Sequence, residues 1–210
     1  MRPDYQTVKQ QGETEIVISK SRFIASVKRT ESEEEALEFI RQIKQEHASA
    51  THNCSAYLIG EHDHIQKAND DGEPSGTAGV PMLEVLKKQG LKDATVVVTR
   101  YFGGIKLGGG GLIRAYGRSA SEGVAAAGIV ERRLHSTMEV TVDYTALGKV
   151  ENEVRQSRWP LDRIDYGEHV MLSVFVPVGE VGDFRDWMAD LTNGQGEVVE
   201  GEKIFLEFSV

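Results

Sequence analysis

The sequence has only one cysteine, Cys54, among its 210 residues. One thiol cannot form a disulfide within the chain, which fits a reducing compartment, so we expect a cytoplasmic location. The sequence also lacks any run of about 18 apolar residues, which argues against a membrane-spanning helix. Its first ten residues, MRPDYQTVKQ, lack the apolar segment of a secretory signal. These absences predict a soluble protein without a membrane partner.

Excess negative charge is confined to the last third of the chain. The formal net charge is -9. Residues 135–210 hold 6 basic and 15 acidic side chains, whereas residues 1–134 hold 18 of each. Such an acidic chain is not expected to bind nucleic acid over its whole surface, but the neutral part can still carry a local basic patch.

The length suits two small domains, and charge and pattern both change near Leu134. In the second part, the hydrophobic pattern predicts strands at 136–143, 162–166, 169–176 and 197–208, and helices at 146–158 and 181–191. This is the βαββαβ order of a ferredoxin-like domain. We therefore expect an α+β protein with domains at residues 1–134 and 135–210.

The first part predicts strands at 15–19, 23–29, 55–59, 65–68 and 95–101, and helices at 32–47, 80–89 and 112–127. Ser32 followed by Glu35 is a capping-box pattern at a helix start. The run Val96-Val97-Val98 is apolar without alternation, which is typical of a strand buried on both faces.

Residues 99–118 have the most unusual composition. Six glycines lie between positions 103 and 111, and no Asp or Glu occurs from Ala94 to Ser121. Glycine lets a ligand approach the backbone, and a helix start attracts anions. We expect contacts to phosphate or RNA, including stacking of Tyr101, Phe102 or Tyr116 on a base. The predicted contact residues are Arg100, Tyr101, Phe102, Gly103, Gly104, Lys106, Gly108, Gly109, Gly110, Arg114, Tyr116 and Arg118.

The glycines also have a purely structural interpretation, as turns and close helix–strand packing. The segment is not a P-loop, because no Lys-Ser or Lys-Thr follows the glycines, and it contains no complete GxGxxG fingerprint.

A second polar segment, Asp70-Asp71-Gly72-Glu73-Pro74, places three carboxylates in four residues. Asp70, Asp71 and Glu73 could bind Mg²⁺, act as an acid–base pair, or belong to a solvated turn. Together with His52 and Gly72 they form a candidate polar site. No cofactor is expected other than this candidate Mg²⁺ ion.

The segment Thr51-His52-Asn53-Cys54 is a third candidate. A Cys–His pair can form a nucleophile, although Cys54 at a strand start is also typical of a small buried residue. A single cysteine argues against a structural zinc site. No residue is assigned a catalytic role from the sequence.

Three segments together resemble the signature of the IMPACT family and its bacterial members of the YigZ type: residues 51–57, 70–79 and 98–108. The resemblance implies that the first domain has the βαβ fold shared by a small-subunit ribosomal protein and domain IV of elongation factor G. By element order, the second domain resembles the last domain of that factor. The partners implied are RNA, the ribosome or a translation-related protein.

We therefore expect a translation-associated binding or regulatory protein rather than an enzyme. One alternative is a metal-assisted enzyme acting on a phosphorylated small molecule. Another is a protein–protein regulator whose acidic second domain docks a basic partner. Whether the acidic and glycine-rich segments meet in one site is a question for the tertiary structure.

Overall fold

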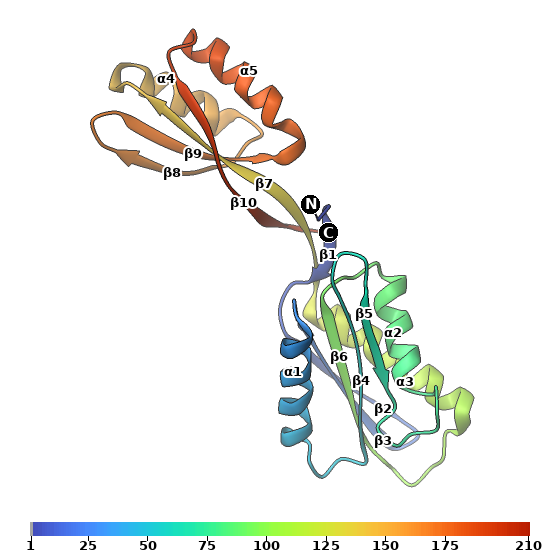
Figure 1. The fold of residues 1–210 in the computed structure, drawn as a ribbon. Helices are drawn as coiled ribbons and strands as arrows, with labels where there is room; N and C mark the ends of the chain where they lie inside the picture. Colours follow the sequence, from blue (N-terminus) through green and yellow to red (C-terminus); the bar gives the residue numbers. More distant parts are fainter. Residues whose placement is uncertain (1) are drawn as a thin grey trace. The chain divides into compact units, whose positions relative to one another are not determined.

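The computed structural model describes residues 2–210, which form two compact units (Figure 1). The N-terminal unit comprises Tyr5–Glu131 with Phe208–Val210, and the C-terminal unit comprises Arg132–Glu207 with residues 2–4. The chain thus passes between units after Glu131, whereas the sequence suggested a boundary after residue 134. Both units contain helices and strands, which confirms the predicted two-domain α+β architecture.

The N-terminal unit is built on an antiparallel five-stranded sheet. Its strand order is β2-β3-β6-β4-β5. The strands are β2 (Gly12–Ile18), β3 (Ser21–Arg29), β4 (His52–Ile59), β5 (Ile65–Asn69) and β6 (Ala94–Tyr101). Central strand β6 pairs Val98 with Ala25 on one side and with Cys54 on the other. Since β3 and β4 both run antiparallel to β6, residues distant in the sequence meet at the end of β6.

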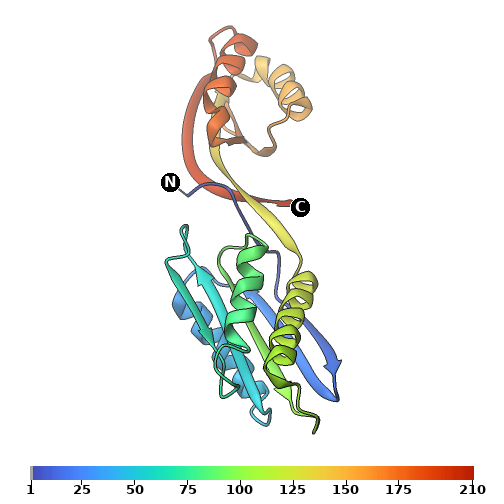
Figure 2. The same ribbon diagram turned by 90° about the vertical axis from the view of Figure 1, so that its right-hand side faces the viewer.

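Helices cover both faces of this sheet. Helix α1 (Glu33–Glu46) lies on one face, and α2 (Gly79–Lys88) and α3 (Gly108–Ala127) lie together on the other (Figure 2). Val97 packs with Phe39 and Ile43 of α1, whereas Val96 and Val98 join the larger core beneath α2 and α3. Successive side chains of a strand point to opposite faces, so the unbroken apolar run reflects burial on both sides, as predicted.

Helix α1 begins at the predicted cap. The Glu35 N–H donates to Ser32 Oγ at 3.2 Å. The Glu35 carboxylate accepts from the N–H of Glu31 at 2.8 Å, one residue before the position of a standard capping box. Helix α3 differs from the prediction, because it begins at Gly108 rather than Leu112. Four consecutive glycines therefore form its first turn.

The C-terminal unit has the predicted ferredoxin-like order. Its elements are β7 (Ile129–Val142), α4 (Tyr144–Gln156), β8 (Leu161–Tyr166), β9 (Val170–Pro177), a 3-10 turn (Val178–Glu180), α5 (Val181–Thr192) and β10 (Glu197–Ser209). The sheet order is β10-β7-β9-β8, and short β1 (Tyr5–Val8) also pairs with β7. The core joins Met138 and Val140 of β7 to Phe184 and Met188 of α5.

The largest differences from the predicted strands are two. Strand β1, with four residues, was not predicted, and β7 begins at Ile129 rather than Ser136. Within residues 2–210, no helix is both long and apolar enough to cross a membrane.

Candidate functional site

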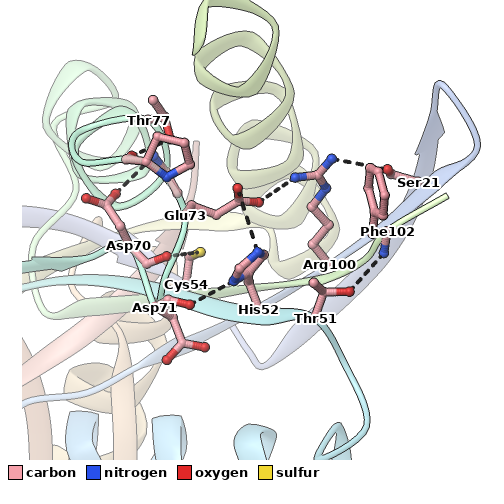
Figure 3. Close-up of polar contacts among 12 residues, drawn as sticks. Ser21, Thr51, His52, Cys54, Asp70, Asp71, Glu73, Thr77, Arg100 and Phe102 are labelled. Atoms are coloured by element: carbon pink, nitrogen blue, oxygen red, sulfur yellow. Dashed lines mark hydrogen bonds and ion pairs between the residues drawn. The ribbon is translucent and has the colours of Figure 1, made fainter. Parts of the chain in front are cut away.

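A pocket of about 430 Å³ opens where β4 begins, β6 ends and α3 begins. Its wall combines the acidic segment with the glycine-rich segment, so the two meet in one site. The lining residues are Thr51, His52, Glu73, Pro74, Arg100, Phe102, Lys106, Leu107, Gly108, Gly109 and Leu112. Figure 3 shows Glu73 and Arg100 facing each other beside His52 and Phe102.

A buried ion pair forms the floor of this site. Arg100 Nη1 donates to Glu73 Oε1 at 2.6 Å, and Arg100 Nη2 donates to Ser21 Oγ at 3.3 Å. The Arg100 and Glu73 side chains are only 6% and 4% exposed. Burial of either charge alone would cost several kcal/mol, so each requires the other. The sequence predicted a phosphate contact at Arg100, and the structure shows that Glu73 already compensates its charge.

The Glu73 oxygen that accepts from Arg100, Oε1, also accepts a second hydrogen bond, and His52 lies near Oε2. The Tyr116 hydroxyl donates to Glu73 Oε1 at 2.8 Å, and His52 Nε2 lies 3.8 Å from Glu73 Oε2. Burial, together with the neighbouring Cys54 and Glu73, raises the pKa of Tyr116. Its phenol therefore stays protonated and keeps donating.

His52 is oriented by the turn that carries the acidic segment. Its Nδ1 lies 2.8 Å from the Asp71 carbonyl oxygen, which can only accept, so Nδ1 carries a hydrogen. Asp71 and Gly72 both adopt positive φ, at 46° and 89°. Glycine tolerates this backbone conformation well, which explains Gly72 in the turn that brings the carbonyl to the ring. His52 Nε2 is left on the pocket side, near Glu73.

The Cys54 thiol is not an activated nucleophile. It lies in the core, where Sγ donates to the Asp70 carbonyl oxygen at 3.0 Å. Burial raises the pKa of Cys54 to about 12, so the thiolate is scarce at neutral pH. Of the two interpretations drawn from the sequence, the small buried residue is the one the structure supports.

Asp70 holds the turn before α2. Its carboxylate accepts the N–H groups of Gly76 at 2.8 Å, Ala78 at 3.0 Å and Gly79 at 2.8 Å. Burial acts to raise the pKa of Asp70, but these three hydrogen bonds outweigh it and the pKa is lowered. Asp70 is therefore a structural anion.

Asp71 ties three elements together. It accepts the Asn53 N–H at 2.7 Å and pairs with Lys44 of α1 at 2.6 Å. Asp70 and Asp71 thus bind protein donors, whereas Glu73 faces the pocket. Among residues 2–210, no three His, Cys, Asp or Glu side chains gather in a way that could hold a metal ion.

The glycine-rich segment has two physical roles. Gly103 meets the β2–β3 turn so closely that an added Cβ would lie 1.9 Å from the Lys20 carbonyl oxygen. Gly108 adopts φ of 69° and, with Gly109, forms pocket wall at the start of α3. Leu107 precedes this helix without a side-chain hydrogen bond to its first N–H groups. The first turn therefore presents bare backbone donors beside the pocket.

The predicted basic residues differ in their surroundings. Lys106 lines the pocket and is exposed. An added Cβ at Gly110 would lie 3.6 Å from Arg114 Nη1, which places that exposed guanidinium along the first turns of α3. Arg114 and Arg118 both lie outside the pocket lining, and Arg118 Nε lies 3.8 Å from Glu122 Oε1. Lys106 and Arg114 are thus the cations at the helix start.

The predicted stacking rings also separate. Phe102 lines the pocket and is 47% exposed, whereas Tyr116 is fully buried. The expectation that Tyr116 stacks on a ligand base is therefore wrong. Tyr101 is half-buried outside the pocket lining, with its hydroxyl 2.9 Å from His47 Nδ1. Gly104 likewise lies outside the lining.

Sequence reasoning missed Ser21, which accepts the Gly103 N–H at 3.2 Å and receives Arg100 Nη2. A serine between two predicted strands carries no distinctive signal. Sequence reasoning also missed the apolar wall of Pro74, Leu107 and Leu112.

The family model of the Impact N-terminal domain matches residues 19–124, which include every pocket-lining residue. The chain belongs to the IMPACT family. A second model, a domain of unknown function (DUF1949), matches residues 140–195 in the C-terminal unit.

Full-length relatives of this IMPACT family chain occur in bacteria. It is 60% identical to IMPACT family member YvyE of Bacillus subtilis, over 100% of this chain and 97% of that protein. It is 36% identical to IMPACT family member YigZ of Escherichia coli, over 89% of this chain and 92% of that protein.

A solved structure of a hypothetical protein is 31% identical, with a TM-score of 0.62, and the match covers 96% of this chain and 99% of that one. The match to Protein IMPACT of Rattus norvegicus is 44% identical but spans only 29% of this chain and 20% of that protein.

Proposed function

We propose that this IMPACT family protein acts in the cytoplasm as a translation-associated binding protein that holds a phosphate group of RNA at the start of α3. The observation that carries the proposal is the bare first turn of α3, which opens into the pocket beside Lys106. Backbone N–H groups and the positive end of a helix dipole favour an anion at this position.

The charges around the pocket support an anionic ligand. Lys106 and Arg114 are exposed at the helix start, and neither has an ion-pair partner within residues 2–210. The one carboxylate in the lining, Glu73, is neutralised by Arg100 at 2.6 Å. A phosphate near α3 would therefore meet donors and cations without an uncompensated negative charge.

The ligand class follows from the family and from the distribution of charge. The resemblance of the signature segments to IMPACT proteins carries the expectation of a regulatory role in translation. The net charge of -9 confines any RNA contact to a small footprint, because phosphate binding over a wide surface requires a basic face.

The test is sedimentation of the protein with ribosomal particles at low and high salt, using wild type and Lys106→Ala/Arg114→Ala. We expect salt-labile co-migration that the double variant loses, because each lost phosphate contact weakens binding and lowers its salt dependence by about one unit of slope. Lys87→Ala/Arg118→Ala removes the same charge outside the pocket and should bind like wild type. Arg100→Ala is unsuitable, because it would leave Glu73 buried without its counter-ion.

If the wild type sediments separately from ribosomal particles at every salt concentration, ribosome binding is refuted. Equal loss of co-migration in both double variants would show that general charge, rather than the start of α3, holds the ligand.

A further inference from the structure

Resting on the proposed phosphate site, we propose that the pocket holds one unpaired nucleotide, with its phosphate at the start of α3 and its base against the Phe102 ring. Figure 3 shows the Phe102 ring beside the Arg100 guanidinium. The N–H groups at the start of α3 and Lys106 would be sufficient to bind a phosphate alone. The additional wall of Phe102, Leu107 and Leu112 is apolar, which suits the flat face of a base.

The Phe102 ring is held in place while a large part of it stays accessible. Its backbone N–H donates to Thr51 Oγ1 at 3.1 Å, and the next N–H, of Gly103, donates to Ser21 Oγ at 3.2 Å. Gly103 packs closely on the Lys20 carbonyl, which holds this backbone segment against the β2–β3 turn. The Arg100 guanidinium lies 5.4 Å from the Phe102 ring centroid. A ring fixed in this way loses little conformational entropy when a base stacks on it.

Within the described part of the chain, Arg100 has one unpaired donor at the wall of the pocket. Its side chain is 6% exposed and lines the pocket, and its Nη1 and Nη2 groups are used by Glu73 and Ser21. Its Nε has no hydrogen-bond partner among residues 2–210. Buried donors are nearly always paired, and an unpaired one calls for an explanation such as a functional role. The Arg100 Nε–H is therefore a candidate donor to an acceptor atom of a ligand.

The polar wall offers the mixed chemistry that a base edge requires. Thr51 Oγ1 accepts the Phe102 N–H, which leaves the hydroxyl hydrogen to donate. His52 presents Nε2, and the Glu73 carboxylate accepts. A pocket of about 430 Å³ lies within the usual size range of small-molecule sites. It therefore suits one nucleotide lifted from its neighbours, and a paired base cannot enter it.

The experiment measures binding of a fluorescein-labelled single-stranded RNA octamer and of the same sequence as a duplex, by fluorescence anisotropy. The variants are Phe102→Leu, which keeps an apolar side chain, and Phe102→Trp, which keeps a ring. We expect the single strand to bind more tightly than the duplex. Phe102→Leu should weaken it by about 10-fold, because stacking on an aromatic ring is lost, and Phe102→Trp should restore it.

Competition distinguishes the two sources of such a nucleotide. Displacement of the octamer by a nucleoside monophosphate at similar concentration indicates a free nucleotide, whereas displacement only by unlabelled RNA indicates a nucleotide within a strand. Either result supports the inference. Inorganic phosphate should compete weakly, and equally, in wild type and Phe102→Leu.

Two results would overturn the inference while the proposed function survives. One is equal affinity for single strand and duplex, and the other is unchanged affinity of Phe102→Leu, each with binding lost in Lys106→Ala. Absence of binding to every RNA would overturn both proposals. Phe102 is half exposed, so its variants should fold, and a thermal unfolding curve like that of wild type verifies this.

Discussion

Glu73 in the N-terminal unit and Asp183 in the C-terminal unit each pair with an arginine, but their surroundings are opposite. The Glu73–Arg100 side chains are 4% and 6% exposed, whereas those of Asp183 and Arg158 are 74% and 62% exposed. Asp70 and Asp71 likewise bind donors inside the N-terminal unit. Asp70, Asp71 and Glu73 hold the loops around the pocket in position, whereas the Asp183 carboxylate is surrounded by solvent.

This difference follows from how the sheets are covered. The N-terminal sheet has helices on both faces, so charged side chains that are buried at its end, such as Glu73 and Arg100, must pair with each other. In the C-terminal unit, α4 and α5 share one core with the sheet, built on Trp159, Phe184 and Trp187. An acidic composition in one region therefore does not locate the functional site, because the carboxylate that lines the pocket, Glu73, is a buried one.

The largest expected effect is on the buried pair. Glu73→Gln removes the carboxylate charge and leaves the Arg100 guanidinium buried without a counter-ion. We expect the free energy of unfolding to fall by about 3–5 kcal/mol. Urea denaturation followed by circular dichroism measures it. Asp183→Asn, which breaks an exposed pair, should lower the free energy of unfolding by less than about 1 kcal/mol. Similar losses of unfolding free energy in both variants would show that burial does not distinguish the two pairs.

A smaller effect, dependent on pH, is expected at Asp70. Its pKa is lowered in the folded state, so its stabilisation is present above the unfolded pKa of about 3.9 and is lost as pH falls through the folded pKa. Asp70→Asn should therefore lower the free energy of unfolding by about 1–2 kcal/mol at pH 7. This difference from wild type should shrink below about pH 4.

The control for Asp70 is Asp186→Asn, an exposed position on α5. Its unfolding free energy should follow that of wild type at each pH. An Asp70→Asn loss that is the same at pH 7 and at pH 3 would show that Asp70 acts through packing rather than through its charge.

The smallest expected effect is that of removing Mg²⁺. The Asp70 and Asp71 oxygens already bind N–H groups and Lys44, which an ion would have to displace. Affinity for the RNA octamer should therefore change by less than about 2-fold when EDTA replaces Mg²⁺ at constant ionic strength. A loss greater than about 10-fold that Mg²⁺ restores in wild type but not in Asp71→Asn would revive the metal-assisted alternative.

Much of the fold was accessible from sequence patterns. The C-terminal order followed from period-2 and period-3.6 hydrophobicity, because each element buries one face of its own. The start of α3 was not predicted, since glycine is a poor helix former and four of them argue locally for a loop. Strand β1 is too short to give a pattern, and its pairing with β7 depends on contacts between distant residues.

The candidate site was predicted in its members more than in their roles. The lack of acids around the glycines singled out the segment that contains Lys106, which lines the pocket. The same pattern placed Arg100 and Tyr116 among the contact residues, because no local signal shows that Glu73 bonds both across the end of the sheet.

The three signature segments were enough to indicate the family, and composition with short-range periodicity was enough to indicate the two α+β units, the buried central strand and the distribution of charge. Which charged side chains can contact a ligand depends on the tertiary structure. Strand β6 lies between β3 and β4, so Arg100 meets Glu73 and Ser21, which lie far from it along the chain. Because both charges are buried, they must pair with each other. Lys106, Phe102 and the first turn of α3 then face the pocket.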